Sequence, residues 1–260
     1  MPPVSAVVIT LNEAAHVGDC LAGLSWADEV LVVDSGSTDN TPELARLAGA
    51  RVITRDWPGY AAQKDFAASQ AAHDWIVSVD ADERVTPELA DEIRRVLASP
   101  GDHAGFRIPR VTFHLGRWIR TTDWYPDYQL RLYDRRRASW TSDTGERRLV
   151  HESVIPRGPV GRLTAELRHF AYRDIAHHYE TMQRYTTLAA DQMSAEGRRA
   201  GLLSLLLHPP AAFLRNYVLK RGCLDGTAGL IISAMNAHYV FLKFAKLWAL
   251  QRDPHWVKRE

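Results

Sequence analysis

Two aspartates, one residue apart, follow a short apolar run in this 260-residue chain. The run 75–79 is typical of a buried strand, and Asp80, Ala81 and Asp82 come directly after it. On an extended chain the side chains of residues i and i+2 point the same way, so both carboxylates can share a divalent cation. Such hard cations prefer oxygen ligands and often bind together with a phosphate. We therefore expect Asp80 and Asp82 to form a metal site for a phosphorylated small molecule.

Two earlier apolar runs also end in polar side chains. The run 29–33 leads to Asp34 and Ser35, and the run 4–9 leads to Thr10, Asn12 and Glu13. If the three strands are parallel neighbours, their carboxyl ends meet at one edge of a sheet, where α/β proteins usually bind ligands. A single aspartate at a strand end is often only a turn former. Three such ends favour a shared site.

The elements that must position these groups alternate between strands and amphipathic helices over the first hundred residues. This alternation predicts an α/β fold with a mostly parallel central sheet flanked by helices. Thr41-Pro42-Glu43 and Thr86-Pro87-Glu88 each combine a capping hydroxyl, a proline suited to the first helical position and an acid that suits a helix N-terminus. Residues 106–167 favour short strands in a mixed extension of the sheet. After Arg168 the pattern is helical, with breaks expected at 208–210 and 222–226.

Composition narrows the classes of function. The formal net charge is +1 and no nucleic-acid-binding motif is present, so we expect no nucleic acid partner. Only two cysteines occur, Cys20 and Cys223, which predicts neither a disulfide framework nor a cysteine-based zinc site. No basic segment followed by an apolar stretch precedes the first strand, so we expect no secretory signal and a cytoplasmic protein.

Charge is distributed unevenly along the chain. Residues 1–100 carry 7 Lys/Arg against 16 Asp/Glu, whereas residues 198–260 carry 10 against 3 and interleave them with leucines and aromatic residues. Basic amphipathic helices favour an anionic membrane surface, although a helical subdomain packed on the core would give the same pattern. The best candidate for a membrane span, 228–242, contains an asparagine and a histidine and is shorter than the ~20 residues that a span needs. We expect peripheral attachment.

The three strand ends resemble the ordered signatures of family-2 glycosyltransferases with the GT-A fold. The matching segments are Thr10-Leu11-Asn12-Glu13, residues 32–39 and residues 79–83. Segments 116–119, 124–132, 150–152 and 214–226 resemble the subgroup that includes the lipopolysaccharide-core β-1,4-glucosyltransferases. The resemblance implies an inverting transfer of a hexose from a nucleotide sugar, with a UDP-sugar expected. It implies a lipid-linked or lipopolysaccharide-core acceptor at the cytoplasmic face of the cell membrane.

The resemblance also implies a domain organisation. A GT-A catalytic domain would cover residues 1–167, with the nucleotide-sugar-binding half at 1–100 and the acceptor-side half at 101–167. Residues 168–260 would form a helical extension that attaches peripherally to the membrane.

Individual roles follow from the same resemblance. Glu13 and Asp34 would accept hydrogen bonds from the nucleoside, in a pocket that also includes Thr10, Asn12 and Ser35. Asp80, with Ala81, would lie near the ribose or the donor sugar. Asp82 would bind Mg²⁺ or Mn²⁺ bridging the diphosphate, and the ion would stabilise the leaving group as a Lewis acid.

Basic side chains would complete the donor site. Lys64 in Gln63-Lys64-Asp65 would contact the nucleotide or its phosphates, although the subgroup commonly has Asn where this chain has Asp65. Gln129 and Arg131 would lie just behind, and Arg131 would neutralise diphosphate charge.

An inverting transfer needs a general base that takes the proton of the acceptor hydroxyl. We predict Asp127 for this role, since it follows Pro126 in a loop rich in aromatic residues. Many relatives carry Glu-Asp where this chain has Pro126-Asp127. Asp123 and Glu152 are the competing carboxylates.

Three histidines, His169, His177 and His178, suggest a metal site because imidazole is a common ligand. No cysteine or acid completes a ligand set by spacing, so we expect surface or interfacial positions.

Two other functions remain open. A haloacid-dehalogenase-like phosphotransferase also uses Asp-x-Asp after a strand, with the first aspartate as nucleophile. A catalytically inactive nucleotide-binding protein of the membrane surface would have the same basic and apolar C-terminal region.

Overall fold

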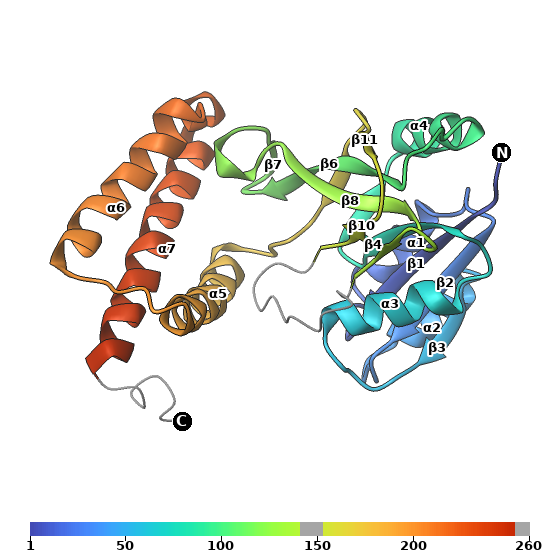
Figure 1. Cartoon of the computed structure of the whole chain (residues 1–260), viewed down its shortest axis with the longest axis horizontal. Helices are drawn as coiled ribbons and strands as arrows, with labels where there is room; N and C mark the ends of the chain where they lie inside the picture. The colour runs from blue at the N-terminus through green and yellow to red at the C-terminus, as the bar shows by residue number, and fades with distance from the viewer. Residues whose placement is uncertain (141–152, 253–260) are drawn as a thin grey trace. The chain divides into compact units, whose positions relative to one another are not determined.

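The computed structural model describes residues 1–140 and 153–252, which form two compact units (Figure 1). Unit 1 comprises the described residues of 1–111, 127–140 and 153–170. Unit 2 comprises 112–126 and 171–252. The functional division at residue 167 stays a prediction.

The centre of unit 1 is a parallel sheet of four strands in the order β3-β2-β1-β4. These strands are β1 (Val4–Thr10), β2 (Glu29–Asp34), β3 (Arg51–Thr54) and β4 (Trp75–Asp80). The register pairs Thr10 with Asp34 and Ile9 with Asp80. The polar groups predicted at the three strand ends therefore meet at one edge of the sheet.

Beyond β4 the sheet becomes mixed, as predicted for residues 106–167. It continues in the order β8-β6-β12-β5, and β7 and β11 also pair with β6. The bounds are β5 (Glu83–Val85), β6 (Gly105–His114), β7 (Arg117–Ile119), β8 (Asp127–Asp134), β11 (Val160–Arg162) and β12 (Leu167–His169). A separate two-stranded sheet pairs β9 (Ala138–Ser139) with β10 (Ile155–Pro156). Because β8 runs antiparallel to β4, the first residues of β8 lie towards the edge where β4 ends.

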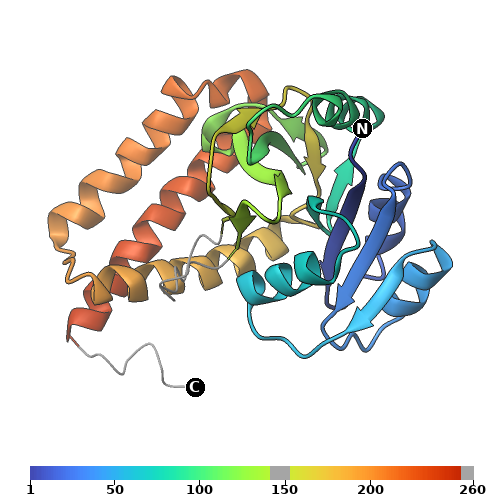
Figure 2. The ribbon, with the colours of Figure 1, turned by 45° about the vertical axis from the view of Figure 1, so that its right-hand side comes forward.

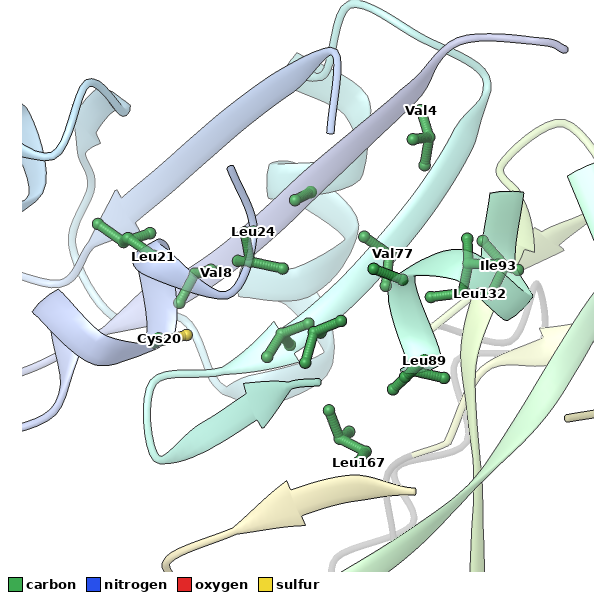
Figure 3. Packing of buried hydrophobic residues seen from close by; sticks show 14 of the residues in the cluster. Val4, Val8, Cys20, Leu21, Leu24, Val77, Leu89, Ile93, Leu132 and Leu167 are labelled. Atoms are coloured by element: carbon green, nitrogen blue, oxygen red, sulfur yellow. The ribbon is translucent and has the colours of Figure 1, made fainter. Parts of the chain in front are cut away.

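Helices cover both faces of the parallel strands. The helices of unit 1 are α1 (Val17–Ala22), α2 (Thr41–Leu47), α3 (Tyr60–Gln70) and α4 (Pro87–Ala98). Val4 and Val8 pack with residues of α1, α2 and α4 on one face (Figure 3), whereas Val7 packs with Ala67 of α3 on the other. This alternation is the period of two expected of a strand that is buried on both faces.

Unit 2 is mainly helical. It contains a 3-10 turn at Thr122–Trp124, α5 (Ile175–Ala195), α6 (Leu202–Leu214), a π-helical turn at Arg215–Leu219, a 3-10 turn at Gly222–Asp225 and α7 (Gly226–Arg252). The last helix packs against both α5 and α6 (Figure 2). Lys246 of α7 fixes the contact with α5, since its Nζ donates to the Gln183 carbonyl at 2.7 Å and to Thr186 Oγ1 at 2.7 Å.

Two expectations about this helical region were wrong. The break expected at 208–210 is absent, because α6 continues through Pro209 and Pro210. Proline removes a backbone donor and crowds the preceding turn, but packing along α7 supports the helix. The apolar stretch expected to end at 242 is also longer: the helical segment Gly222–Arg252 is long and apolar enough, by length and composition alone, to cross a membrane.

Candidate functional site

Asp34, at the end of β2, is buried and hydrogen-bonded on both carboxylate oxygens. Its Oδ1 accepts from Thr10 Oγ1 at 3.0 Å and from Ser37 Oγ at 2.6 Å. Its Oδ2 accepts from the backbone N–H groups of Gly36 and Ser37, at 3.0 and 2.9 Å. Gly36 has φ of +84°, a left-handed conformation that glycine adopts without strain. Asp34 therefore holds the loop after β2 in shape.

The loops after β1 and β2 are joined by hydrogen bonds. The backbone N–H of Asn12 donates to Ser37 Oγ at 2.8 Å, and its Oδ1 accepts from the Thr38 N–H at 2.8 Å. The Glu13 N–H donates to Thr41 Oγ1 at 2.8 Å. These contacts give Asn12 and Glu13 fixed positions beside the loop that Asp34 organises.

Ser35 lies against α3. Its Oγ accepts from Gln63 Nε2 at 3.1 Å. Gln63 is fully buried, and its Oε1 atom has no partner among the residues that the structure describes. An uncompensated buried acceptor costs free energy.

The Glu13 carboxyl is half-buried near other acids. Burial is the main cause that raises its pKa from 4.5 to about 7, and the neighbouring Asp82 and Asp39 add to the shift, whereas Arg84 opposes it. Glu13 is thus able to change its charge near neutral pH.

Asp80 is held between two buried cations. Lys64 Nζ lies 2.7 Å from Asp80 Oδ1, and Arg131 Nη2 donates to Asp80 Oδ2. Burial by itself would raise the pKa of the Asp80 carboxyl, but Arg131 and Lys64 together hold it far below its usual range. For Lys64 burial is the stronger influence and lowers the pKa of the ammonium group, although Asp80 opposes this. The neighbouring Asp65 accepts from the Trp140 N–H at its Oδ1, at 2.7 Å.

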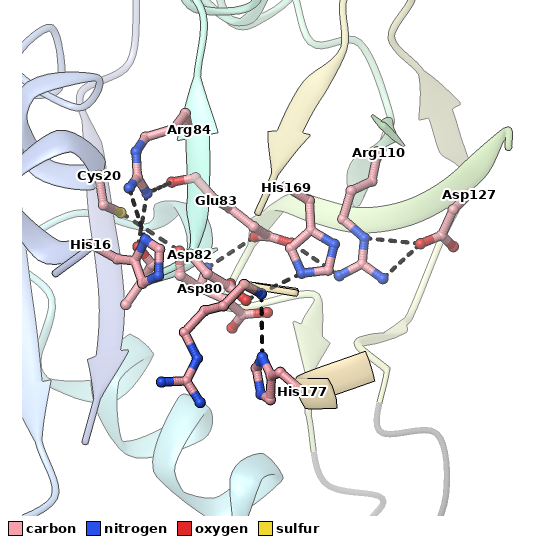
Figure 4. A network of polar contacts seen from close by, with 12 residues as sticks. His16, Cys20, Asp80, Asp82, Glu83, Arg84, Arg110, Asp127, His169 and His177 are labelled. Carbon is pink, nitrogen blue, oxygen red and sulfur yellow. Dashed lines mark hydrogen bonds and ion pairs between the residues drawn. The ribbon is translucent and has the colours of Figure 1, made fainter. Parts of the chain in front are cut away.

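Glu83 is a fully buried carboxylate that links the basic side chains (Figure 4). Its Oε1 accepts from Arg131 Nη2 at 2.6 Å and from Arg110 Nη1 at 3.1 Å, and its Oε2 accepts from the Asp80 N–H at 2.9 Å. Glu83 and Arg110 were not predicted as site residues from the sequence. The available signal was the position of Glu83 directly after Asp82, because a charged group so close to a buried strand needs a partner.

Asp127, at the start of β8, belongs to the same network. Its Oδ2 accepts from Arg110 Nε and Nη2 at 2.9 and 2.7 Å, and its Oδ1 accepts from Gln129 Nε2 at 2.6 Å. Of the two competing carboxylates, Asp123 lies in unit 2, where it pairs with Arg215. Glu152 lies outside the described residues.

Asp82 meets a histidine. His169 Nε2, from β12, lies 3.3 Å from Asp82 Oδ2, and the Phe170 N–H donates to the Asp82 carbonyl at 2.9 Å. Burial would raise the pKa of Asp82, but His169 outweighs it and lowers the pKa. His169 is partly buried, and the pairing of β12 with β5 places it beside Asp82.

The other two histidines are in unit 2. His178 is buried, with its Nδ1 3.1 Å from His114 Nε2, and burial is the first cause that lowers its pKa to about 4. His177 lies in the first turn of α5, where its backbone N–H donates to Oδ1 of the N-cap residue Asp174 at 2.7 Å.

Asp82 and His169 fit a divalent cation better than Asp80 does. They offer a carboxylate and an imidazole nitrogen, ligands that suit Mn²⁺ and, through the carboxylate, Mg²⁺. Both oxygens of Asp80 are already held by Lys64 and Arg131. Within 1–140 and 153–252, no group of three or more His, Cys, Asp or Glu side chains is arranged to hold a metal. Phosphate oxygens and water would therefore have to complete the ligand shell.

Comparison with known proteins identifies the family. The family model for glycosyl transferase family 2 matches residues 5–157. The lipopolysaccharide core biosynthesis glycosyltransferase LpsC of Rhizobium meliloti is 34% identical, over 97% of this chain and 96% of that protein. An uncharacterized glycosyltransferase of Rickettsia felis is 30% identical, over 95% and 90% of the two chains.

A solved structure agrees with the architecture. The mannosyltransferase PcManGT from Pyrobaculum calidifontis, in complex with GDP-Man and Mn²⁺, superposes with a TM-score of 0.54 at 16% identity, covering 95% of this chain and 87% of that chain. The family match leaves no place for the haloacid-dehalogenase alternative, and it confirms the resemblance found in the sequence. The chain belongs to glycosyl transferase family 2 and has the GT-A fold.

Proposed function

We propose that this glycosyltransferase moves a hexose from a nucleotide sugar to a lipid-linked saccharide of the lipopolysaccharide core, with inversion and with a divalent cation. The observation that carries the proposal is the pairing at the end of β4: Asp82 contacts His169, while Asp80 lies between Lys64 and Arg131. A UDP-sugar is the first donor to test. The acceptor class is inferred from the name of the relative LpsC, which covers nearly the whole chain.

The donor diphosphate would bind where the cations gather. Asp82 and His169 would hold Mn²⁺ or Mg²⁺, which supplies Lewis acid stabilisation of the leaving nucleoside diphosphate. Lys64 and Arg131 would add positive charge beside it, and Asp80 and Glu83 fix both side chains in place. Because these groups are already oriented, little reorganisation is needed when charge develops on the leaving group.

The nucleoside would lie against the loops after β1 and β2. The internal hydrogen bonds of Asp34 support a role in shaping this pocket together with Thr10, Asn12 and Ser35. Glu13 is the better candidate for direct contact with the base. As a carboxylate it accepts from a ring N–H, and in its protonated form it donates to a ring carbonyl.

Asp127 would act as the general base. It would take the proton of the acceptor hydroxyl while the hydroxyl oxygen bonds to the anomeric carbon and the bond from that carbon to the phosphate oxygen breaks. Arg110 and Gln129 hold the carboxylate in one orientation. For this role Asp127 must give up part of its pairing with Arg110 when substrates bind.

The acceptor is proposed to be lipid-linked, and the protein to attach peripherally at the cytoplasmic face of the cell membrane. The basic and apolar C-terminal region supports this location. Lys246 of α7 hydrogen-bonds to residues of α5, so its charged group is engaged within the helical unit. This contact supports peripheral attachment.

The test of the proposed reaction is a transfer assay with a panel of UDP- and GDP-sugars, Mn²⁺ and extracted lipopolysaccharide core. The product is analysed by proton NMR, because the coupling of the anomeric proton reports its configuration. We expect transfer from one donor with a β linkage formed from an α donor. Donor binding without transfer would favour the inactive binding protein, and retention of configuration would contradict the role of Asp127.

A further inference from the structure

The outer face of α6 is apolar and exposed. Five leucines on this helix are each at least 58% exposed: Leu202, Leu203, Leu206, Leu207 and Leu214. Their spacing of three and four residues puts them on one side of the helix. Single exposed leucines are normal on a protein surface, but five on one helix face mark an interaction surface. We call these five residues the α6 leucine face.

The opposite side of α6 is already used for packing. Ala212 is buried, and the His208 ring stacks on Phe244 of α7 with 4.6 Å between ring centroids. Helix α6 therefore has a fixed orientation in unit 2. Its leucine face is turned away from α7 and is not needed for the packing of the helices.

Positive charge borders the α6 leucine face at both ends. Arg198 and Arg199 precede the helix, and Lys220 and Arg221 follow it; all four are exposed. The stretch 197–224 contains no aspartate or glutamate. Arg215, also in this stretch, pairs with Asp123 and adds less free charge.

This pattern of charge indicates which partner the α6 leucine face can bind. If two copies of the chain paired through α6, the cations at the ends of one helix would lie near the cations of the other, whichever way the helices ran, and like charges repel. A layer of anionic lipid matches both the cations and the exposed leucines. Its headgroups neutralise the cations, and its acyl chains receive the leucines. The length of α6, about 20 Å by its helical rise, suits a helix lying in the plane of the interface.

We propose that the α6 leucine face, with Arg198, Arg199, Lys220 and Arg221, is the surface through which this protein binds an anionic membrane. The proposal builds on the membrane attachment proposed above and is independent of the transfer reaction. It assigns the contact to α6 rather than to α7, although α7 belongs to the segment with the length and composition of a membrane span.

The test is co-sedimentation of the full chain with vesicles, without donor or metal. One set of vesicles is phosphatidylcholine alone, and the other contains about one third phosphatidylglycerol. The informative variant is Leu203→Glu/Leu207→Glu, and Arg198→Glu/Arg199→Glu tests the charge. Leu47→Glu is the matched control, because Leu47 is an even more exposed leucine on α2 of unit 1. Circular dichroism verifies that each variant is folded.

We expect the protein to bind the anionic vesicles much more strongly than the neutral ones, and less strongly at high salt. The double leucine variant should lower the partition constant about tenfold or more, and the double arginine variant should lower it by at least about fivefold for each arginine reversed. Leu47→Glu should change nothing. Failure of the wild-type protein to bind, equal binding by the double leucine variant, or a dimer that this variant dissociates would each overturn the proposal. None of these results depends on donor binding, which is measured separately.

Discussion

Lys64 Nζ lies 2.7 Å from Asp80 Oδ1, so the first aspartate of the Asp80/Asp82 pair is the partner of a buried ammonium group. Arg131 holds its other oxygen. The second aspartate instead faces the imidazole of His169. The two carboxylates, which look equivalent in the sequence, therefore have different environments. Asp80 organises the basic groups, and Asp82 is the aspartate that we propose binds a cation.

Replacing Arg131 by methionine should strongly destabilise unit 1. It would leave Asp80 with Lys64 alone and the fully buried Glu83 with Arg110 alone, and removing one partner of a buried ion pair typically costs 3–5 kcal/mol, so we expect a loss of up to about that size. The measurement is urea denaturation followed by circular dichroism. Arg94→Met is the control: Arg94 forms an exposed pair with Asp91 at 3.2 Å, and its loss should cost less than about 1 kcal/mol. Equal midpoints for the two variants would contradict the role assigned to Arg131.

Asp127→Asn should abolish most of the transfer while leaving donor binding nearly unchanged. An amide cannot take the proton of the acceptor hydroxyl, and loss of a general base typically lowers kcat by about 10²–10⁴-fold. Single-turnover transfer and donor titration measure the two properties separately. Asp123→Asn is the matched control, since Asp123 pairs with Arg215 in unit 2. If Asp123→Asn lost activity and Asp127→Asn kept it, the assignment of the base would be wrong.

Glu13→Gln should stabilise the protein at alkaline pH. Glu13 ionises near 4.5 in an ordinary setting and near 7 in the folded protein, because burial and nearby acids disfavour its charge. Between these values the folded state binds the extra proton, so this group's contribution to stability falls as the pH rises, and it stays low above 7. The neutral amide of the Glu13→Gln variant removes this loss of stability, because it carries no charge at any pH.

Thermal unfolding of Glu13→Gln is measured at about pH 5 and pH 8, and we expect Tm to rise at the higher pH by about 2–4 °C, the shift that ~1 kcal/mol produces in a chain of this size. Glu88→Gln should act in the opposite direction. Glu88 lies in the first turn of α4, where a backbone N–H and Thr86 lower its pKa. A lower Tm for Glu13→Gln at pH 8 would show that ionised Glu13 stabilises the fold.

Several of the features predicted correctly from the sequence are local ones. The acids at the ends of β2 and β4 follow apolar runs, and such runs form strands by burial alone. Thr86 caps α4 as predicted, with its Oγ1 accepting from the Leu89 N–H at 3.2 Å. The parallel prediction for Thr41 was wrong by one residue, because Asn40 is the N-cap. The Thr41 hydroxyl contacts Glu13 and Asp39 instead.

The features that were missed depend on strands that pair late in the chain. Glu83 and Arg131 are 48 residues apart, and their ion pair forms only because β8 lies beside β4. His169 reaches Asp82 through the pairing of β12 with β5. Spacing in the sequence carries no information about such contacts, since it specifies neither strand order nor register.

The central claim is that Asp82 and His169 hold a cation that helps to bind a nucleotide sugar. Calorimetric titration of UDP and UDP-sugars in the presence and absence of Mn²⁺ tests it most directly, using the wild-type protein, Asp82→Ala, His169→Ala and the control Asp91→Ala. We predict Mn²⁺-dependent binding that is lost in Asp82→Ala, weakened about 10–100-fold in His169→Ala and kept in Asp91→Ala. Mn²⁺-dependent binding that survives in Asp82→Ala would contradict the account.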